Sequence, residues 1–260
     1  MTDQHSERRP RRRGIYLLPN LLTTTALLFG FYAIVSAMHG VYQASAVAIF
    51  IAMVMDGMDG RVARLTNTQS DFGVQYDSIA DMVSFGLAPS LVMYEWALRD
   101  LAQLGSIWGK LGWLGAFIYT ACAGLRLARF NTQVGVADKR FFQGLPSPAA
   151  AATVAGLVWA GNRLEFGGWG VGIPALVLTI AAGILMVSNF RYYSFKEFDF
   201  RYRVPFMAVV LIVLGIALTS VHPPTVLFLV FLVYMCSGPV LTLVLRRRHR
   251  QRRRRGEGHP

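Results

Sequence analysis

Long apolar runs, separated by short and mostly basic polar segments, follow one another along nearly the whole chain. A hydrocarbon core about 30 Å thick is crossed by roughly 20 consecutive apolar residues in a helix. The pattern predicts about eight spanning helices, at residues 16–38, 42–64, 76–98, 107–128, 147–161, 168–189, 204–220 and 224–245. The fifth run is short and rich in alanine and glycine, which predicts close packing against other helices rather than contact with lipid. We therefore expect an all-α, polytopic membrane protein.

The composition agrees with a membrane protein and excludes both an ordinary soluble domain and a fold held by cysteines. Apolar residues make up 54% of the 260 residues and charged residues only 15%, whereas a soluble domain carries about 25% charged residues. The two cysteines, Cys122 and Cys236, both fall within apolar runs. Neither a disulfide framework nor a cysteine-based zinc site is therefore indicated.

The basic residues predict the orientation, because Lys and Arg are concentrated in cytosolic loops. With both termini and every second connection in the cytosol, only Arg99, Lys110 and Arg163 of the 26 Lys and Arg residues lie outside. The chain then divides into a basic cytosolic N-terminus (1–15), a transmembrane domain (16–245) and a basic cytosolic tail (246–260). We expect the basic ends to attract anionic lipid headgroups, and we expect no nucleic-acid partner.

Four aspartates indicate the chemistry of the transmembrane domain. Asp56 and Asp59 lie three residues apart near the end of the second run, and Asp77 and Asp81 lie four apart at the start of the third. Each spacing places its pair on one face of a helix, so two antiparallel helices can aim four carboxylates into one volume. Such clustered anions are costly within a membrane, and oxygen-bound divalent cations relieve their repulsion. Four carboxylates suit two ions, an arrangement that assists phosphoryl transfer.

A purely structural role, as helix caps or ion-pair partners, is the alternative for aspartates in this region. It suits Asp71, which follows Ser70 at the predicted start of a helix. It does not suit Asp56 and Asp59, because the helix macrodipole disfavours negative charge near a helix C-terminus.

This stretch resembles the signature of the CDP-alcohol phosphotransferase family, with the pattern Asp56-x-x-Asp59-Gly60-x-x-Ala63-Arg64, eight residues, then Gly73-x-x-x-Asp77-x-x-x-Asp81. The resemblance implies that family's fold and a catalytic role for residues 16–245. The family consists of helical membrane enzymes, usually homodimers, that transfer a substituted phosphoryl group from a CDP-linked donor to an alcohol and release CMP. It implies that the four aspartates bind two divalent ions, Mg²⁺ or Mn²⁺, and that Asp81 also takes the proton of the acceptor hydroxyl. It implies contacts with the CDP group from Gly60, Arg64 and Gly73.

Three further residues are candidates for the nucleotide pocket. In the family, the start of the first span and a hydroxyl six residues past the arginine help to line this pocket. The corresponding residues here are Asn20, Thr23 and Ser70. Each also suits a local role as a helix cap or turn residue, and both interpretations stand.

Four other stretches resemble the bacterial phosphatidylserine synthase branch of the family: DSIADMVSFGLAPS (77–90), AGLRLARFN (123–131), FQGLPSPAAA (142–151) and MVSNFRYYSF (186–195). The branch implies CDP-diacylglycerol as donor and L-serine as acceptor, with the active site on the cytosolic side of the bacterial inner membrane. The candidates to bind the serine carboxylate or a lipid phosphate are Arg126, Arg129, Asn131 and Arg191. Their alternative role is topological, with long side chains reaching the headgroup region.

Two other functions remain open at this stage. The acceptor could be glycerol-3-phosphate or an inositol (phosphate) derivative, which would also need cationic residues. Outside the enzymes, intramembrane aspartates mark cation or proton transporters. Transporters commonly show broken helices near the middle of the membrane or repeated halves, and this sequence shows neither pattern.

Overall fold

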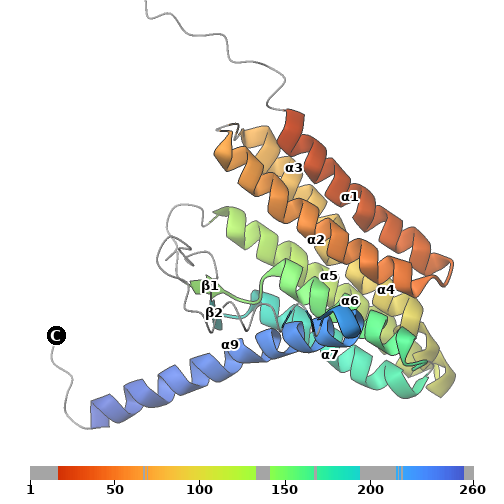
Figure 1. The fold of residues 1–260 in the computed structure, drawn as a ribbon. Helices are drawn as coiled ribbons and strands as arrows, with labels where there is room; N and C mark the ends of the chain where they lie inside the picture. The colour runs from red at the N-terminus through yellow and green to blue at the C-terminus, as the bar shows by residue number, and fades with distance from the viewer. Residues whose placement is uncertain are drawn as a thin grey trace, which may run out of the picture.

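The computed structural model shows a bundle of long helices (Figure 1). The residues that it describes are 17–66, 68, 70–132, 141–166, 169–193, 215, 217 and 219–254. The first two helices, α1 (Leu17–Met38) and α2 (Tyr42–Leu65), pack side by side along their length. Gly40 in the turn between them has φ +75°, a left-handed conformation that glycine adopts without steric cost.

Residues 71–104, called the third segment below, form a series of consecutive α-, π- and 3₁₀-helical pieces that includes the predicted span 76–98. Its parts are α3 (Asp71–Asp81), the π-helical turn η2 (Met82–Leu87), α4 (Ala88–Met93), the π-helical turn η3 (Tyr94–Leu98) and the 3₁₀ turn η4 (Arg99–Leu104). In the first π turn, Ser84 Oγ donates to the Ala26 carbonyl of α1 at 3.1 Å. A Cβ on Gly30 of α1 would lie 2.5 Å from the same Oγ. The wide turn that follows Asp81 therefore coincides with a close approach of α1.

The remaining helices are α5 (Ser106–Thr132), α6 (Ser147–Arg163), α7 (Trp169–Val187) and α9 (Pro223–Arg254). Helix α6 is the predicted fifth run, and it packs against α2, α4, α7 and α9. Its small residues permit this contact: a Cβ on Gly156 would lie 3.0 Å from Phe228 Cα, and one on Gly161 would lie 2.4 Å from the Trp96 ring. Most of α6 is buried, so the prediction of close packing is confirmed.

Four helices in the described part of the chain are long and apolar enough to cross a membrane: Leu18–Met38, Ser106–Thr132, Gly170–Val187 and Pro223–Thr242. The predicted spans 42–64, 76–98 and 147–161 are helical but are not among the four, and the helix at the last of these has only 17 residues. The first of them carries two aspartates in its apolar run, and the second is divided into short helical pieces. The predicted span 204–220 lies almost entirely outside the described residues, so the count of eight stays a prediction.

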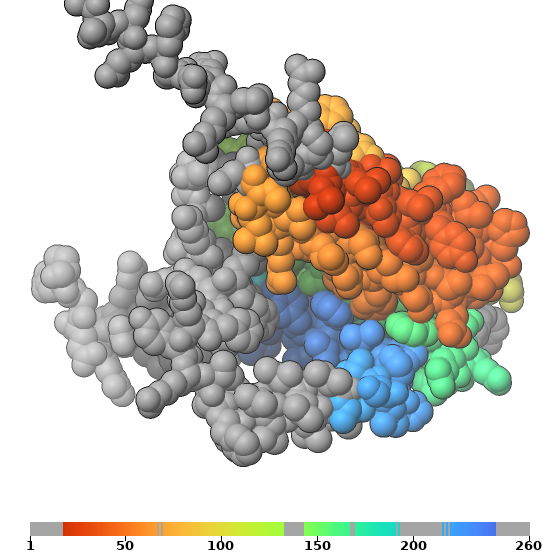
Figure 2. Space-filling model, turned by 45° about the horizontal axis from the view of Figure 1, so that its top comes forward, coloured from red at the N-terminus to blue at the C-terminus, as the bar shows by residue number. Residues whose placement is uncertain are grey.

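The outward sides of the bundle carry large apolar side chains. Leu21, Leu28 and Phe31 of α1 and Trp113 and Phe117 of α5 are all exposed. In the space-filling view, α1 and α2 (red to orange) form one continuous surface (Figure 2). Exposed apolar side chains on helices of this length are what a lipid-facing surface requires.

Two short strands, which the sequence analysis does not predict, lie at one end of the bundle. Strand β1 (Phe141–Gln143) pairs antiparallel with β2 (Arg191–Tyr193) and joins the chain that follows α5 to the chain that follows α7. Gly144 after β1 has φ +79°, and a Cβ there would lie 2.2 Å from the Met186 carbonyl oxygen. Tyr192 of β2 is buried, and its hydroxyl donates to the Met235 carbonyl of α9 at 2.9 Å.

Helix α9 continues through most of the basic tail. The predicted span ended at residue 245, whereas the helix runs unbroken to Arg254 and extends away from the bundle (Figure 1). The boundary placed at 246 therefore falls inside a helix rather than at the end of one.

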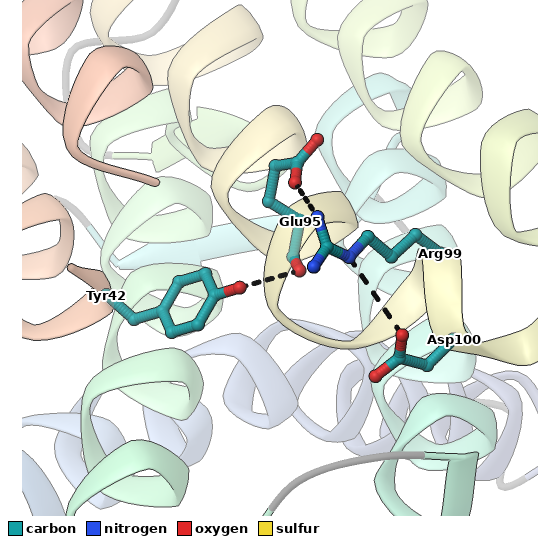
Figure 3. A network of polar contacts seen from close by, with 4 residues as sticks. All are labelled: Tyr42, Glu95, Arg99 and Asp100. Atoms are coloured by element: carbon teal, nitrogen blue, oxygen red, sulfur yellow. Dashed lines mark hydrogen bonds and ion pairs between the residues drawn. The ribbon is translucent and has the colours of Figure 1, made fainter. Parts of the chain in front are cut away.

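A polar network joins the start of α2 to the far end of the third segment (Figure 3). The Tyr42 hydroxyl donates to the Glu95 carbonyl at 3.0 Å, and Arg99 pairs with Glu95 and, at 3.9 Å, with Asp100. The Glu95 carboxylate raises the pKa of the Arg99 guanidinium above its ordinary value. Arg99 is thus a permanent cation paired locally, at the end of α2 opposite to Asp56 and Asp59.

The contact between Tyr192 and α9 can be tested at Gly238. A Cβ on Gly238 would lie 2.2 Å from Tyr192 Cζ, so Gly238→Ala should lower the free energy of unfolding by about 1–3 kcal/mol through overpacking. The measurement is thermal unfolding of the purified protein in detergent. Gly170→Ala is the matched control, because a Cβ there meets nothing within 4 Å. Equal melting temperatures for the two variants would contradict the prediction.

Candidate functional site

Three aspartates from two helices gather at one point of the structure. Asp56 and Asp59 project from α2 and Asp77 from α3, and each offers a carboxylate oxygen within 4.8 Å of the others. Asp59 is buried, with 4% of its surface exposed, and the other two are half-buried. The helical spacing of three residues brings Asp56 and Asp59 together, and the packing of the bundle adds Asp77.

Asp81, the fourth predicted residue, lies beside this cluster. It ends α3 one turn after Asp77 and interacts electrostatically with Asp56 and Asp77 and with the Arg126 guanidinium. It is not one of the three whose oxygens lie within 4.8 Å of one another. The structure thus holds three carboxylates in one group and a fourth that interacts with two of them, Asp56 and Asp77, and less strongly with Arg126.

Thr23 of α1 contacts the acidic cluster directly. Its Oγ1 donates to Asp59 Oδ2 at 2.6 Å, and both residues are buried. The sequence analysis placed Thr23 in the nucleotide pocket or in a local turn. In the structure, its hydroxyl has the local contact as well, at 3.1 Å from the Pro19 carbonyl, but its shorter contact is with Asp59. A hydroxyl bound in this way can orient the Asp59 carboxylate, as hydrogen-bonding partners of metal ligands do.

Ser70, Asn20 and Gly73 lie together beside the cluster. Ser70 caps α3, because its Oγ accepts a hydrogen bond from the Gly73 amide at 3.1 Å. Ser70 thus has the helix-capping role that was one of its two predicted roles. Asp71 lies in the first turn of the same helix. A Cβ on Gly73 would lie 3.2 Å from Ser70 Oγ and 3.5 Å from Asn20 Oδ1, so the three residues lie in close contact.

Gly60 faces open space. A Cβ there would meet only Arg64 Nη1, at 3.9 Å, and Arg64 itself is exposed. Packing inside the protein therefore does not require glycine at position 60, although glycine destabilises a helix relative to alanine.

The two arginines of α5 have different surroundings. Arg126 Nη1 donates to Ser147 Oγ, at the first residue of α6, at 2.8 Å. Arg129 donates to Gln143 Oε1 at 2.6 Å, to Asn189 Oδ1 at 2.8 Å and to the Val187 carbonyl at 3.3 Å. Arg129 thus ties α5 to the chain on both sides of the two-stranded sheet.

The other two candidates are Asn131 and Arg191. Asn131 Nδ2 donates to Ser78 Oγ at 3.0 Å, next to Asp77 on α3. Arg191 begins β2, and its side chain lies outside the described residues. The sequence analysis assigned no role to Ser78, Gln143 or Asn189, although all three lie in the stretches that carry the branch resemblance.

The donor set suits a divalent cation. Hard cations such as Mg²⁺ and Ca²⁺ take oxygen ligands, and carboxylates from neighbouring turns are common among them. Among the described residues, no ion pair involves Asp59 or Asp77, so no basic side chain there neutralises either carboxylate by direct contact. The group of Asp56, Asp59 and Asp77 could therefore hold a divalent ion.

Comparison with known proteins identifies the family. A family model described as CDP-alcohol phosphatidyltransferase matches residues 16–237. The chain belongs to the CDP-alcohol phosphatidyltransferase family. Its membership confirms the predicted class of membrane enzyme, and the apolar helices agree with an integral membrane protein. The use of divalent metals in this family agrees with the acidic cluster.

Curated members of the CDP-alcohol phosphatidyltransferase family resemble this chain over most of its length. A CDP-diacylglycerol–serine O-phosphatidyltransferase of Helicobacter pylori is 33% identical over 231 residues, which cover 89% of this chain and 93% of the relative. A protein of the same name from Mycobacterium bovis is 34% identical over 244 residues, covering 89% and 81%. An archaetidylserine synthase of Methanothermobacter thermautotrophicus is 32% identical over 177 residues, covering 67% and 69%.

The contact between Thr23 and Asp59 makes a prediction about metal affinity. Thr23→Val keeps the shape of the side chain but removes the donor to Asp59, so Mn²⁺ should bind about tenfold or more weakly, as expected for loss of a residue that orients a ligand. Titration of the purified protein with Mn²⁺, followed by electron paramagnetic resonance, measures this directly. Thr25→Val is the matched control, since Thr25 donates, among the described residues, only to the Leu21 carbonyl on the same helix. Equal Mn²⁺ affinity of both variants would show that Thr23 does not orient Asp59 for metal.

Proposed function

We propose that this protein transfers the phosphatidyl group of CDP-diacylglycerol to the hydroxyl of L-serine, giving phosphatidylserine and CMP. The observation that carries the proposal is the gathering of the signature aspartates of α2 and α3 in a chain that matches the family over residues 16–237. Serine as acceptor is supported by the relatives named for it, which match 89% of this chain.

The CDP group binds beside the acidic cluster in this proposal. Gly60 leaves room above α2 for the nucleotide diphosphate, and the exposed Arg64 guanidinium, which lies one turn further on, can fork onto its phosphates. Gly73, Asn20 and Ser70 line the adjoining space on α1 and α3. Thr23 contributes indirectly, through Asp59. The acyl chains stay in the bilayer, which already holds the donor.

The catalytic residues act around the β-phosphorus, which carries the diacylglycerol. Asp56, Asp59, Asp77 and Asp81 hold two divalent ions, Mg²⁺ or Mn²⁺, in this proposal. When bound, such ions polarise phosphoryl oxygens and neutralise charge on the leaving group. Asp81 accepts the proton of the serine hydroxyl, and the serine oxygen forms a bond to the β-phosphorus. The bond between that phosphorus and the oxygen of CMP breaks, and CMP leaves with the bonding electrons.

The proposed location is the bacterial inner membrane, with both termini and the active site in the cytosol. Its support is the distribution of Lys and Arg, which concentrates on one side under the positive-inside rule. Residues 16–245 form the catalytic domain in this proposal, with the basic ends near anionic headgroups. The family resemblance further supports a homodimer.

The chemistry can be tested by CMP release from purified protein in detergent, given CDP-diacylglycerol, Mg²⁺ or Mn²⁺, and one acceptor at a time. We expect release with L-serine and none after EDTA. Asp81→Asn should lower kcat about 100-fold or more, the usual contribution of a general base. Asp71→Asn is the matched control, because Asp71 is exposed in the first turn of α3 and should keep activity near that of the wild type.

The other outcomes of this assay distinguish the alternatives. Release only with glycerol-3-phosphate or an inositol acceptor would retain the mechanism and reject serine. The absence of CMP release with every acceptor, from protein shown to be folded, would reject the enzyme proposal in favour of transport.

Gly60 gives an independent test of the CDP pocket. Gly60→Ala should raise the apparent KM for CDP-diacylglycerol about tenfold, since a methyl group in close contact with a ligand costs about 1–3 kcal/mol. The same substitution should leave the melting temperature equal or higher, because alanine favours a helix over glycine by about 0.5–1 kcal/mol. Steady-state kinetics and thermal unfolding on the same samples measure both effects. An unchanged KM would exclude Gly60 from the pocket.

A further inference from the structure

Arg126 has a buried donor without an acceptor. Its Nη1 donates to Ser147 Oγ at 2.8 Å, but its Nε is buried and finds no hydrogen-bond partner among the described residues. A buried donor left unsatisfied is destabilising, and more so on a charged group. The guanidinium therefore has the capacity to bind a further acceptor at this position.

The charge of Arg126 is also incompletely balanced. In the described part of the chain, no carboxylate lies within the 4.0 Å of an ion pair with it. The groups that interact with it electrostatically are Asp81, Tyr119 and Tyr234. Of these, Tyr119 donates its hydroxyl proton to the Phe85 carbonyl at 3.0 Å. A buried cation with a spare N–H thus lies close to the proposed base, Asp81.

Arg129 provides the contrast. It follows Arg126 by three residues on the same face of α5, and it has the same chemistry. Yet its guanidinium is occupied by three protein acceptors, on Gln143, Asn189 and Val187. Arg129 is a brace between segments, and Arg126 is the arginine of this pair with a buried donor that lacks an acceptor.

We propose that Arg126 binds the carboxylate of the acceptor L-serine, an assignment that rests on the proposed function. In serine, the hydroxyl-bearing carbon is bonded to the carbon that carries the carboxylate, so both groups must be recognised close together. Asp81 and Arg126 interact electrostatically and match these two groups, with the Asp81 carboxylate at the serine hydroxyl and the Arg126 guanidinium at the serine carboxylate. Ser147 holds the guanidinium in place. A carboxylate completes the hydrogen bonding of Nε and supplies the anion that Arg126 lacks.

The assignment predicts which acceptors the enzyme selects. Serinol differs from serine by a hydroxymethyl group in place of the carboxylate, so it keeps the reacting hydroxyl but loses the group that Arg126 binds. Arg126→Leu should lower the ratio of kcat/KM for serine to kcat/KM for serinol by about 10- to 100-fold, the size expected for loss of a hydrogen bond between charged groups. Arg126→Lys keeps the charge without the fork of donors and should recover part of the ratio.

The experiment uses the full chain in detergent with CDP-diacylglycerol and Mn²⁺, measuring CMP release with each acceptor and thermal unfolding of each variant. If Arg126→Leu does not fold, Ser147→Ala provides the test, since it removes only the hydroxyl that positions the guanidinium and should lower the same ratio in a folded protein. Arg129→Lys is the control: it should lower the melting temperature and leave the ratio within twofold.

Three results would overturn the assignment. A serine-to-serinol ratio that is unchanged in both Arg126→Leu and Ser147→Ala would show that Arg126 does not bind the carboxylate. A rise in the KM for CDP-diacylglycerol with an unchanged ratio would place Arg126 on a donor phosphate instead. If the wild-type protein releases no CMP with serine, the proposed function itself fails, and this assignment fails with it.

Discussion

Repulsion between carboxylates is the constraint on which the rest of this structure depends. Asp56, Asp59 and Asp77 offer oxygens within 4.8 Å of one another, in a setting where like charges repel strongly. The helices that carry them must be held together by contacts made elsewhere. Helix α1 supplies several: Thr23 binds Asp59, the Thr24 and Tyr76 hydroxyls lie 2.9 Å apart, and Ser84 binds the Ala26 carbonyl. Hydrogen bonds from α1 thus hold α2 and the third segment together at the acidic cluster.

A second set of contacts supports the same site from the opposite side. The four stretches that carry the branch resemblance are far apart in the sequence, yet polar contacts join them around the end of α5. Asn131 binds Ser78, Arg126 binds Ser147, and Arg129 binds both Gln143 and Asn189. The four stretches that resemble the phosphatidylserine synthase branch therefore contact one another in the folded protein. This set of contacts joins the end of α5 to α3 through Asn131 and Ser78, and Arg126 of α5 interacts electrostatically with Asp81 of α3.

The sequence predicted the features that depend on local spacing. Helical periodicity placed Asp56 and Asp59 on one face, and the small residues of α6 indicated its burial. It could not predict features that depend on long-range contact. Strands of three residues are too short to show an alternating pattern, and the π turn after Asp81 coincides with the approach of Gly30 and Ala26 on another helix. The sequence does not predict the extension of α9 to Arg254, because a run of charge ends an apolar span without ending the helix, and arginine is a good helix former.

Arg126 and Arg129 show most clearly why a sequence cannot assign roles within such a site. They are identical in type, three residues apart on one helix, and equally suited to an anion. Only the surroundings separate them, because Arg129 has its acceptors within the protein and Arg126 Nε does not. The same criterion separates Gly60, whose face is open, from Gly156, which is required by packing against α9. In a bundle this closely packed, the residues available to a substrate are those whose bonding or packing the protein leaves incomplete.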